Sequence, residues 1–75
     1  MKGTVKTKDF IKVLKYWGLE ERRTKGSHQS WAKKGMTRPV IVPITKKEIK
    51  IGPFKQNLKT LEKTEKEFFD ALEKI

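Results

Sequence analysis

The chain has 75 residues, no cysteine and 1 histidine, and 19 Lys and Arg residues against 9 Asp and Glu residues give it a net charge of +10. This composition excludes disulfides and thiol catalysis, and a single histidine without neighbouring carboxylates does not make a typical zinc site. No apolar run is long enough for a signal peptide or a transmembrane helix, so we expect a cytoplasmic protein that does not bind membranes. The length predicts one domain, residues 1–75, which we expect to be a monomer when free.

The positive charge is unevenly distributed along the chain. Residues 1–38 carry a net charge of +8, residues 39–60 carry +4, and residues 61–75 carry −2. A basic body of this kind indicates a polyanionic partner, most often nucleic acid. An anionic membrane surface or an acidic protein is the alternative partner, and a soluble, Lys-rich surface without any specific partner is the further alternative.

The first predicted element is a helix over residues 8–17, preceded by a flexible lead-in at residues 1–6. Thr7 is the predicted N-cap, and Gly18 is the predicted stop. The apolar residues fall at the spacing i, i+1, i+4 and i+7 that places them on one helix face: Phe10, Ile11, Leu14 and Trp17.

Three strands are predicted next. Residues 19–24 and 27–31 flank the turn signal Lys25-Gly26 and predict a β-hairpin. Residues 38–43 form the clearest strand because β-branched residues fill its centre, with prolines at its ends. The polar, basic residues 45–50 are predicted to be a loop.

Alternation along a strand fixes the relation between the single histidine and the tryptophan that follows it. His28 and Trp31 are three residues apart, so a regular strand directs them to opposite faces of the sheet. If Trp31 packs against helices, His28 lies on the open, solvated face. A lone histidine is more often a surface residue without a role, and exposure among cationic neighbours is what makes His28 a candidate.

The C-terminal part is predicted to form two helices, over about residues 53–62 and 65–74, the latter within the terminal segment 64–75. Gly52 is the predicted N-cap of the first helix, followed by Pro53 at its first position. The segment Thr64-Glu65-Lys66-Glu67 has the form of a capping box, which favours a second helix start. One continuous helix of about 22 residues is the alternative.

The predicted order is α-β-β-β-α(-α). It corresponds to an α+β two-layer sandwich, in which helices cover one face of a three-stranded antiparallel sheet. This is the architecture of double-stranded-RNA-binding domains (dsRBD-like), which together with the charge favours an RNA-binding protein.

Several short motifs carry a more specific resemblance. They are Tyr16-Trp17-Gly18 at the end of the first helix, Lys25-Gly26-Ser27-His28, Trp31, the strand Val40-Ile41-Val42-Pro43, and Ile51-Gly52-Pro53-Phe54-Lys55. On these motifs the chain resembles HicA-type toxins, the mRNA interferases of bacterial and archaeal toxin–antitoxin pairs, over about residues 7–62. It departs from them in having Gln29 where members often have a second histidine. It also lacks the His-Pro that commonly follows the third strand, having Ile44-Thr45-Lys46-Lys47 there.

The resemblance implies a small endoribonuclease that needs neither metal nor cofactor and cleaves mRNA, with His28 as the catalytic residue. It also implies inhibition by a cognate HicB-type antitoxin. Cationic and polar residues near His28 in the sequence are the candidate RNA-binding residues: Lys25, Ser27, Arg22, Arg23, Lys33 and Lys34. A non-catalytic dsRBD-like RNA-binding module is the alternative function, and a protein-interaction or membrane-surface role is a third.

Overall fold

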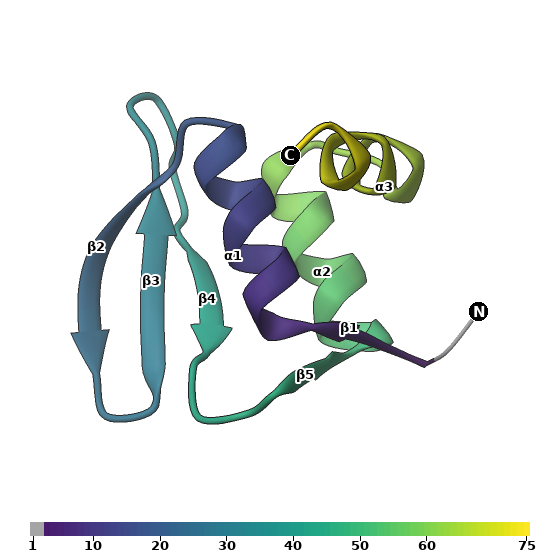
Figure 1. The fold of residues 1–75 in the computed structure, drawn as a ribbon. Coiled ribbons are helices and arrows are strands. Elements are labelled where there is room, and N and C mark those ends of the chain that lie inside the picture. Colours follow the sequence, from purple (N-terminus) through teal and green to yellow (C-terminus); the bar gives the residue numbers. More distant parts are fainter. Residues whose placement is uncertain (1–2) are drawn as a thin grey trace.

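A computed structural model describes residues 3–75 and contains three helices and five strands within them (Figure 1). The elements follow in the order β1 (Thr4–Lys6), α1 (Thr7–Tyr16), β2 (Glu20–Lys25), β3 (His28–Ala32), β4 (Val40–Pro43), β5 (Glu48–Lys50), α2 (Ile51–Leu61) and α3 (Glu65–Lys74). The α1-β2-β3-β4-α2-α3 part of this order confirms the predicted α+β class.

The main sheet is three-stranded and antiparallel, in the order β2-β3-β4. The strands follow one another through short connections, as predicted, although the third begins at Val40 rather than at residue 38. Figure 1 shows the helices on one side of this sheet, with α1 and α2 side by side and α3 across their far end. The fold is therefore consistent with a dsRBD-like two-layer sandwich.

The hydrophobic core lies between the sheet and the helices and has three phenylalanines at its centre. Phe10, Phe54 and Phe68 come from the three different helices and are fully buried. The rings of Phe54 and Phe68 lie 4.8 Å apart edge to face, and those of Phe10 and Phe68 lie 5.8 Å apart. Strands β3 and β4 contribute buried side chains from the sheet: Trp31, Val40 and Val42.

A second, two-stranded sheet was not predicted from the sequence. Strand β1 pairs antiparallel with β5, with Val5 opposite Ile49, and both of these side chains are buried. The predicted flexible lead-in is therefore wrong for residues 4–6, and the predicted loop is wrong for residues 48–50. Each strand has only three residues, which is too short to show alternation, and the partners are more than 40 positions apart. Residues 1–2 of the predicted lead-in lie outside the described residues.

The helix starts differ from the predictions in a way that this small sheet explains. Helix α1 begins at Thr7 itself, whose hydroxyl donates to the Lys46 carbonyl at 2.6 Å, so Thr7 is not the N-cap. Helix α2 begins at Ile51, so Gly52 is not its N-cap either. The Ile51 N–H donates to the Gly3 carbonyl at 2.9 Å, and each helix thus follows directly from a strand of the β1–β5 pair.

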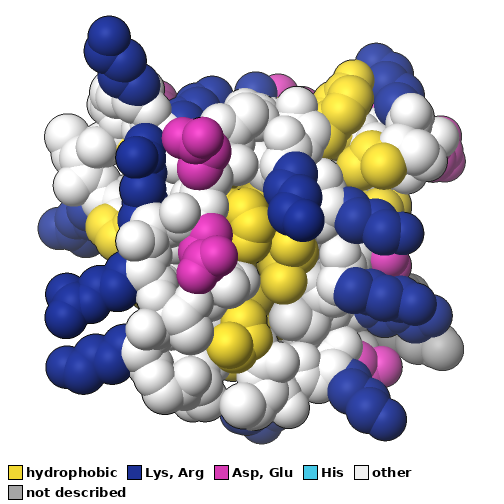
Figure 2. All heavy atoms as spheres, turned by 60° about the vertical axis from the view of Figure 1, so that its left-hand side comes forward, with side chains coloured by type: hydrophobic (Ala, Val, Ile, Leu, Met, Phe, Trp, Pro, Cys, Tyr) yellow, Lys and Arg dark blue, Asp and Glu magenta, His cyan; other side chains and the backbone are white. Residues whose placement is uncertain are grey.

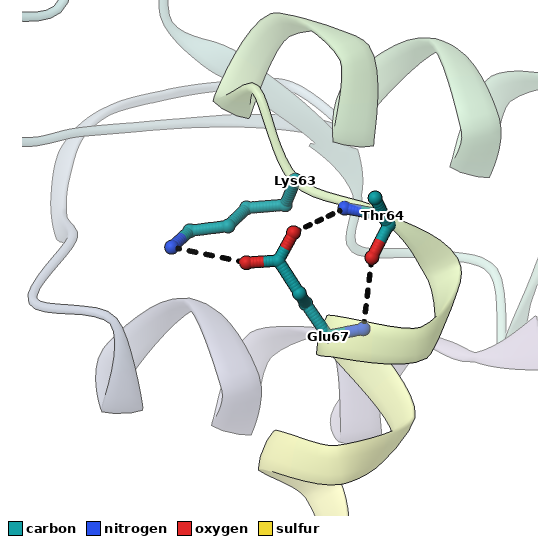
Figure 3. Close-up of polar contacts among 3 residues, drawn as sticks. All are labelled: Lys63, Thr64 and Glu67. Carbon is teal, nitrogen blue, oxygen red and sulfur yellow. Dashed lines mark hydrogen bonds and ion pairs between the residues drawn. The ribbon is translucent and has the colours of Figure 1, made fainter.

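Helices α2 and α3 are separate, which decides against one continuous helix. Glu62 adopts a left-handed conformation (φ 58°) at the end of α2, and the Lys63 N–H donates back to the Leu58 carbonyl at 2.9 Å. The predicted capping box is present: the Glu67 N–H donates to Thr64 Oγ1, and the Thr64 N–H donates to Glu67 Oε1 (Figure 3). The hydrogen bond from the Thr64 backbone is the main cause that holds the pKa of Glu67 below its ordinary value.

Candidate functional site

His28 is the first residue of β3 and lies directly after the turn that joins β2 to β3. Lys25 and His28 are opposite each other, so Gly26 and Ser27 form a two-residue hairpin loop. Gly26 has φ +59°, a conformation that such tight turns require and that glycine adopts without strain. The turn therefore presents the exposed His28 side chain at one end of the sheet.

The strand register determines which side chains share a face with His28. Directly opposite residues of antiparallel strands project to the same side. Lys25 of β2 and Pro43 of β4 flank His28, and in the next row on this face Arg23 and Ile41 flank Ser30. The open face thus places two cations, Lys25 and Arg23, on the same side of the sheet as the histidine.

A β-bulge in β2 contributes to this arrangement. Glu21 pairs with Trp31 and Arg23 pairs with the next residue, Ser30, so Arg22 has no partner in the register. Without the extra residue, Glu21 and Arg23 would project to the same face, because they are two positions apart. The bulge directs Arg23 to the face of His28 and Glu21 to the helix side, which removes a carboxylate from the neighbourhood of His28.

The other face of β3 is packed and hydrogen-bonded. Trp31 is only 5% exposed, and its Nε1 donates to Gln29 Oε1 at 2.8 Å. Gln29 Nε2 in turn donates to Thr24 Oγ1 at 3.3 Å, and the Thr24 hydroxyl donates to Glu21. This chain of hydrogen bonds fixes β2 and β3 together on the side of the helices. The prediction that His28 and Trp31 face opposite sides is confirmed.

The position of Gln29 gives a physical account of one departure from the HicA pattern. Gln29 is adjacent to His28 in the sequence but lies on the opposite face of the sheet, where it accepts a hydrogen bond from the buried indole. A histidine at this position would project toward the helix side and away from His28. The open face therefore keeps its one imidazole whether residue 29 is Gln or His.

The remaining predicted site residues lie at different distances from His28. Ser27 is half-buried in the turn, and its carbonyl accepts a hydrogen bond from the Ile44 N–H at 2.9 Å. Arg22 lies at the bulge, 3.9 Å from Glu20 in an exposed ion pair, a kind of contact that contributes little to stability.

Lys33 and Lys34 follow the far end of β3, so the length of the strand, on the order of 15 Å, separates them from His28. The fold brings Lys25 and Arg23 to His28, but not Lys33 and Lys34.

Sequence reasoning missed a second group of cations at the end of the sheet where His28 lies. Figure 1 shows the β2–β3 turn, the β4–β5 connection and the start of α1 toward the same end of the main sheet, and hydrogen bonds from Ile44 to Ser27 and from Thr7 to Lys47 link them. Exposed lysines lie at the end of β1 and on the last two of these segments: Lys6, Lys8, Lys46 and Lys47. The signal in the sequence was the Lys46-Lys47 pair shortly after the third strand, but only the β1–β5 pairing brings the first two lysines beside it.

Positive charge also predominates on the side of the molecule nearest β2. Figure 2 shows Lys and Arg side chains around most of this face, with a strip of hydrophobic atoms between them and acidic side chains beside this strip. Within residues 3–75, no three His, Asp or Glu side chains come close enough together to hold a metal ion. None of the helices described here is long and apolar enough to cross a membrane.

Comparison with known proteins agrees with this interpretation of the motifs and the fold. No curated protein matches the chain. The family model described as the HicA toxin of bacterial toxin–antitoxin systems matches residues 7–62, from the first residue of α1 to the residue after α2. This range is well over half of the chain and includes the turn, His28 and all three strands of the main sheet. The chain therefore belongs to the HicA toxin family.

Proposed function

We propose that this toxin is an endoribonuclease that cleaves mRNA, with His28 as its general acid and base. The observation that carries the proposal is the exposed His28 on the open face of the sheet, flanked by Lys25 and close in register to Arg23. RNA supplies its own nucleophile, the 2′-hydroxyl, so the protein needs only a base, a proton donor and positive charge near the phosphate.

One imidazole is sufficient for both proton transfers of the reaction. Neutral His28 takes the proton of the 2′-hydroxyl while the O2′–P bond forms, and the charge that develops on the phosphate oxygens is stabilised by Lys25 and Arg23. The P–O5′ bond then breaks, and the imidazolium of His28 returns its proton to the leaving 5′-oxygen. The products are a 2′,3′-cyclic phosphate and a 5′-hydroxyl. Proton transfer of this kind typically contributes about 10²–10⁴-fold to the rate.

The other predicted RNA-binding residues take a more distant part in this proposal. Ser27 orients the turn through its carbonyl, and Arg22 adds charge at the edge of the sheet. Lys33 and Lys34 would contact RNA only if the bound RNA extends along the whole length of β3. Their substitution should weaken binding without changing the rate at saturating RNA.

The chemistry is tested by the form of the substrate. The purified protein should cut an RNA oligonucleotide and leave 2′,3′-cyclic phosphate ends, and it should not cut the same oligonucleotide with 2′-O-methyl groups. A chelator should leave the rate unchanged. Cleavage of the methylated RNA at the same rate would contradict the proposal, because the attacking hydroxyl would then come from elsewhere.

We also propose that the partner of this toxin is a HicB-type antitoxin that covers the open face of the sheet. Occlusion of His28 requires a surface that complements Lys25 and Arg23, so an acidic patch on the partner is expected. Co-expression with the protein encoded beside it should give a stable complex without RNase activity. A complex that cleaves RNA as fast as the free toxin would contradict this mode of inhibition.

A further inference from the structure

A hollow lies between the start of α1 and the connection from β4 to β5, on the helix side of the main sheet. Its volume is about 520 Å³, within the range of small-molecule sites. The apolar part of its surface comes from the half-buried Ile11 and from Ile44, which is 37% exposed. The full lining is Lys6, Thr7, Lys8, Ile11 and Ile44 to Glu48, and we call it the lysine-rimmed hollow.

The charge around this hollow is strongly one-sided. Four exposed lysines surround it, against a single carboxylate, Glu48. Among the described residues, none of these four lysines is within ion-pair distance of an acidic side chain; the three ion pairs there involve Arg22, Lys55 and Lys63. The lysine ammonium groups are therefore available to a ligand, and the ligand that suits them is anionic.

The walls of the hollow are held together by the fold. Thr7 is buried and uses both its hydroxyl and its N–H, which donate to the carbonyls of Lys46 and Lys47 at 2.6 and 2.9 Å. Lys6 pairs with Glu48 in the β1–β5 sheet. Because these contacts join the two walls through the backbone, the hollow exists before a ligand binds, which lowers the entropic cost of binding.

The hollow begins one residue away from the row that contains His28. Pro43 lies opposite His28, and Ile44, which lines the hollow, is the next residue. The Ile44 N–H donates to the carbonyl of Ser27, the residue before His28. An RNA strand that passes His28 on the open face would therefore reach the hollow by turning around this end of the sheet (Figure 1).

We propose that the lysine-rimmed hollow binds nucleotides of single-stranded RNA that lie beyond the two nucleotides joined by the cleaved bond. Lys8, Lys46 and Lys47 would contact phosphates, and Ile11 and Ile44 would contact the face of an unpaired base. Single-stranded RNA fits better than a duplex, because only an unpaired base exposes its face to an apolar surface. This inference rests on the proposed ribonuclease function and adds a second contact region to it.

The test compares two triple variants with the same reduction in charge. Lys8→Gln/Lys46→Gln/Lys47→Gln changes the hollow, and Lys59→Gln/Lys66→Gln/Lys74→Gln removes three exposed charges from α2 and α3. The backbone carbonyls that anchor Thr7 remain in the first variant. Binding of a 2′-O-methyl RNA of about 12 nucleotides, which should not be cleaved, is measured as a function of salt concentration, with a wild-type slope of log K against log[salt] of about −3 to −5 expected.

The hollow variant should have a slope shallower by about 0.7 for each phosphate that it no longer neutralises, or about 2 in all, and the control variant should keep the wild-type slope. An unchanged slope in the hollow variant, with wild-type binding and cleavage intact, would overturn this inference alone. Failure of the wild type to bind RNA would overturn the ribonuclease proposal as well. A hollow variant that no longer binds the antitoxin but keeps the RNA slope would assign the hollow to the protein partner and overturn the RNA assignment.

Substrate length separates a flanking contact from a direct role in the reaction. A dinucleotide is too short to occupy both His28 and the hollow, so its kcat/KM should be the same in the wild type and the hollow variant. For the longer unmodified RNA, kcat/KM should fall at least tenfold in the hollow variant. An equal decrease on both substrates would mean that these lysines act on the reacting phosphate, which contradicts a separate flanking site.

Discussion

The two faces of strand β3 differ in burial, hydrogen bonding and neighbouring charge, although they belong to the same five-residue strand. On the helix side, Trp31 is buried and Gln29 accepts its indole hydrogen bond. On the open side, His28 is exposed and lies between Lys25 and Pro43. Substitutions on the helix side should therefore lower the free energy of unfolding, and substitutions on the open side should mainly change RNA cleavage.

The largest decrease in stability is expected from a substitution in the hydrophobic core, between the sheet and the helices. Phe68→Ala removes a fully buried ring that packs against Phe54 and Phe10, and the expected cost is about 3–5 kcal/mol. For a domain of this size that is most of the total stability. Urea denaturation followed by circular dichroism measures it, and Phe68→Leu, which leaves a smaller cavity, gives a folded variant for comparison. A decrease under about 1 kcal/mol for Phe68→Ala would mean that α3 contributes little to the core.

A smaller decrease is expected at the start of α3. Thr64→Ala removes the side chain that accepts from the Glu67 N–H, which should lower the free energy of unfolding by about 1 kcal/mol. Thermal unfolding measures this, and Thr60→Ala is a suitable control because the Thr60 hydroxyl donates to the carbonyl of Gln56 in the same helix, α2. Equal melting temperatures for Thr64→Ala and the wild type would contradict the role of the capping box.

The pH dependence of stability should report the same capping box. Because the pKa of Glu67 is lowered in the folded protein, its charged form stabilises the fold above the ordinary carboxyl pKa. That contribution disappears as the pH falls through the lowered pKa. The stability difference between the wild type and Glu67→Gln should thus be largest near neutral pH and shrink in acid. A difference that does not change with pH would show that the charge of Glu67 has no role.

The smallest effect on stability is expected on the open face. Ile41 is 40% exposed there, and its hydrogen bond to α2 is through its carbonyl, which accepts from Asn57 at 3.2 Å. Ile41→Thr keeps that carbonyl and a β-branched side chain, so the free energy of unfolding should change by less than about 0.5 kcal/mol. Chemical denaturation is accurate enough to detect a larger decrease, which would show that the open face contributes to folding.

The main features of the fold could be predicted because their signals are local. The apolar spacing of Phe10 and Leu14, the Gly26 turn and the Thr64–Glu67 capping box are each visible within a few residues, and the structure contains all of them. Alternation within one strand was also sufficient to separate His28 from Trp31. These features depend on the neighbouring residues and not on distant ones.

The rest could not be predicted because it depends on contacts between distant segments. Strands β1 and β5 each bury a single side chain, Val5 or Ile49, and form only because they pair with each other. The same region uses the Thr7 hydroxyl, which the sequence assigned to an N-cap. The lysine-rimmed hollow follows from this pairing, so no local pattern indicated it.

The most direct measurement compares two adjacent substitutions that lie on opposite faces. His28→Ala should leave the melting temperature nearly unchanged and lower the RNA cleavage rate by about 10²-fold or more. Gln29→Ala should remove the acceptor of the Trp31 indole, lower the melting temperature by about 4–8 °C, and keep the cleavage rate of the folded protein within a few-fold of the wild type. If His28→Ala is folded and still cleaves RNA at the wild-type rate, the catalytic role of His28 is contradicted, and cleavage would depend on other residues.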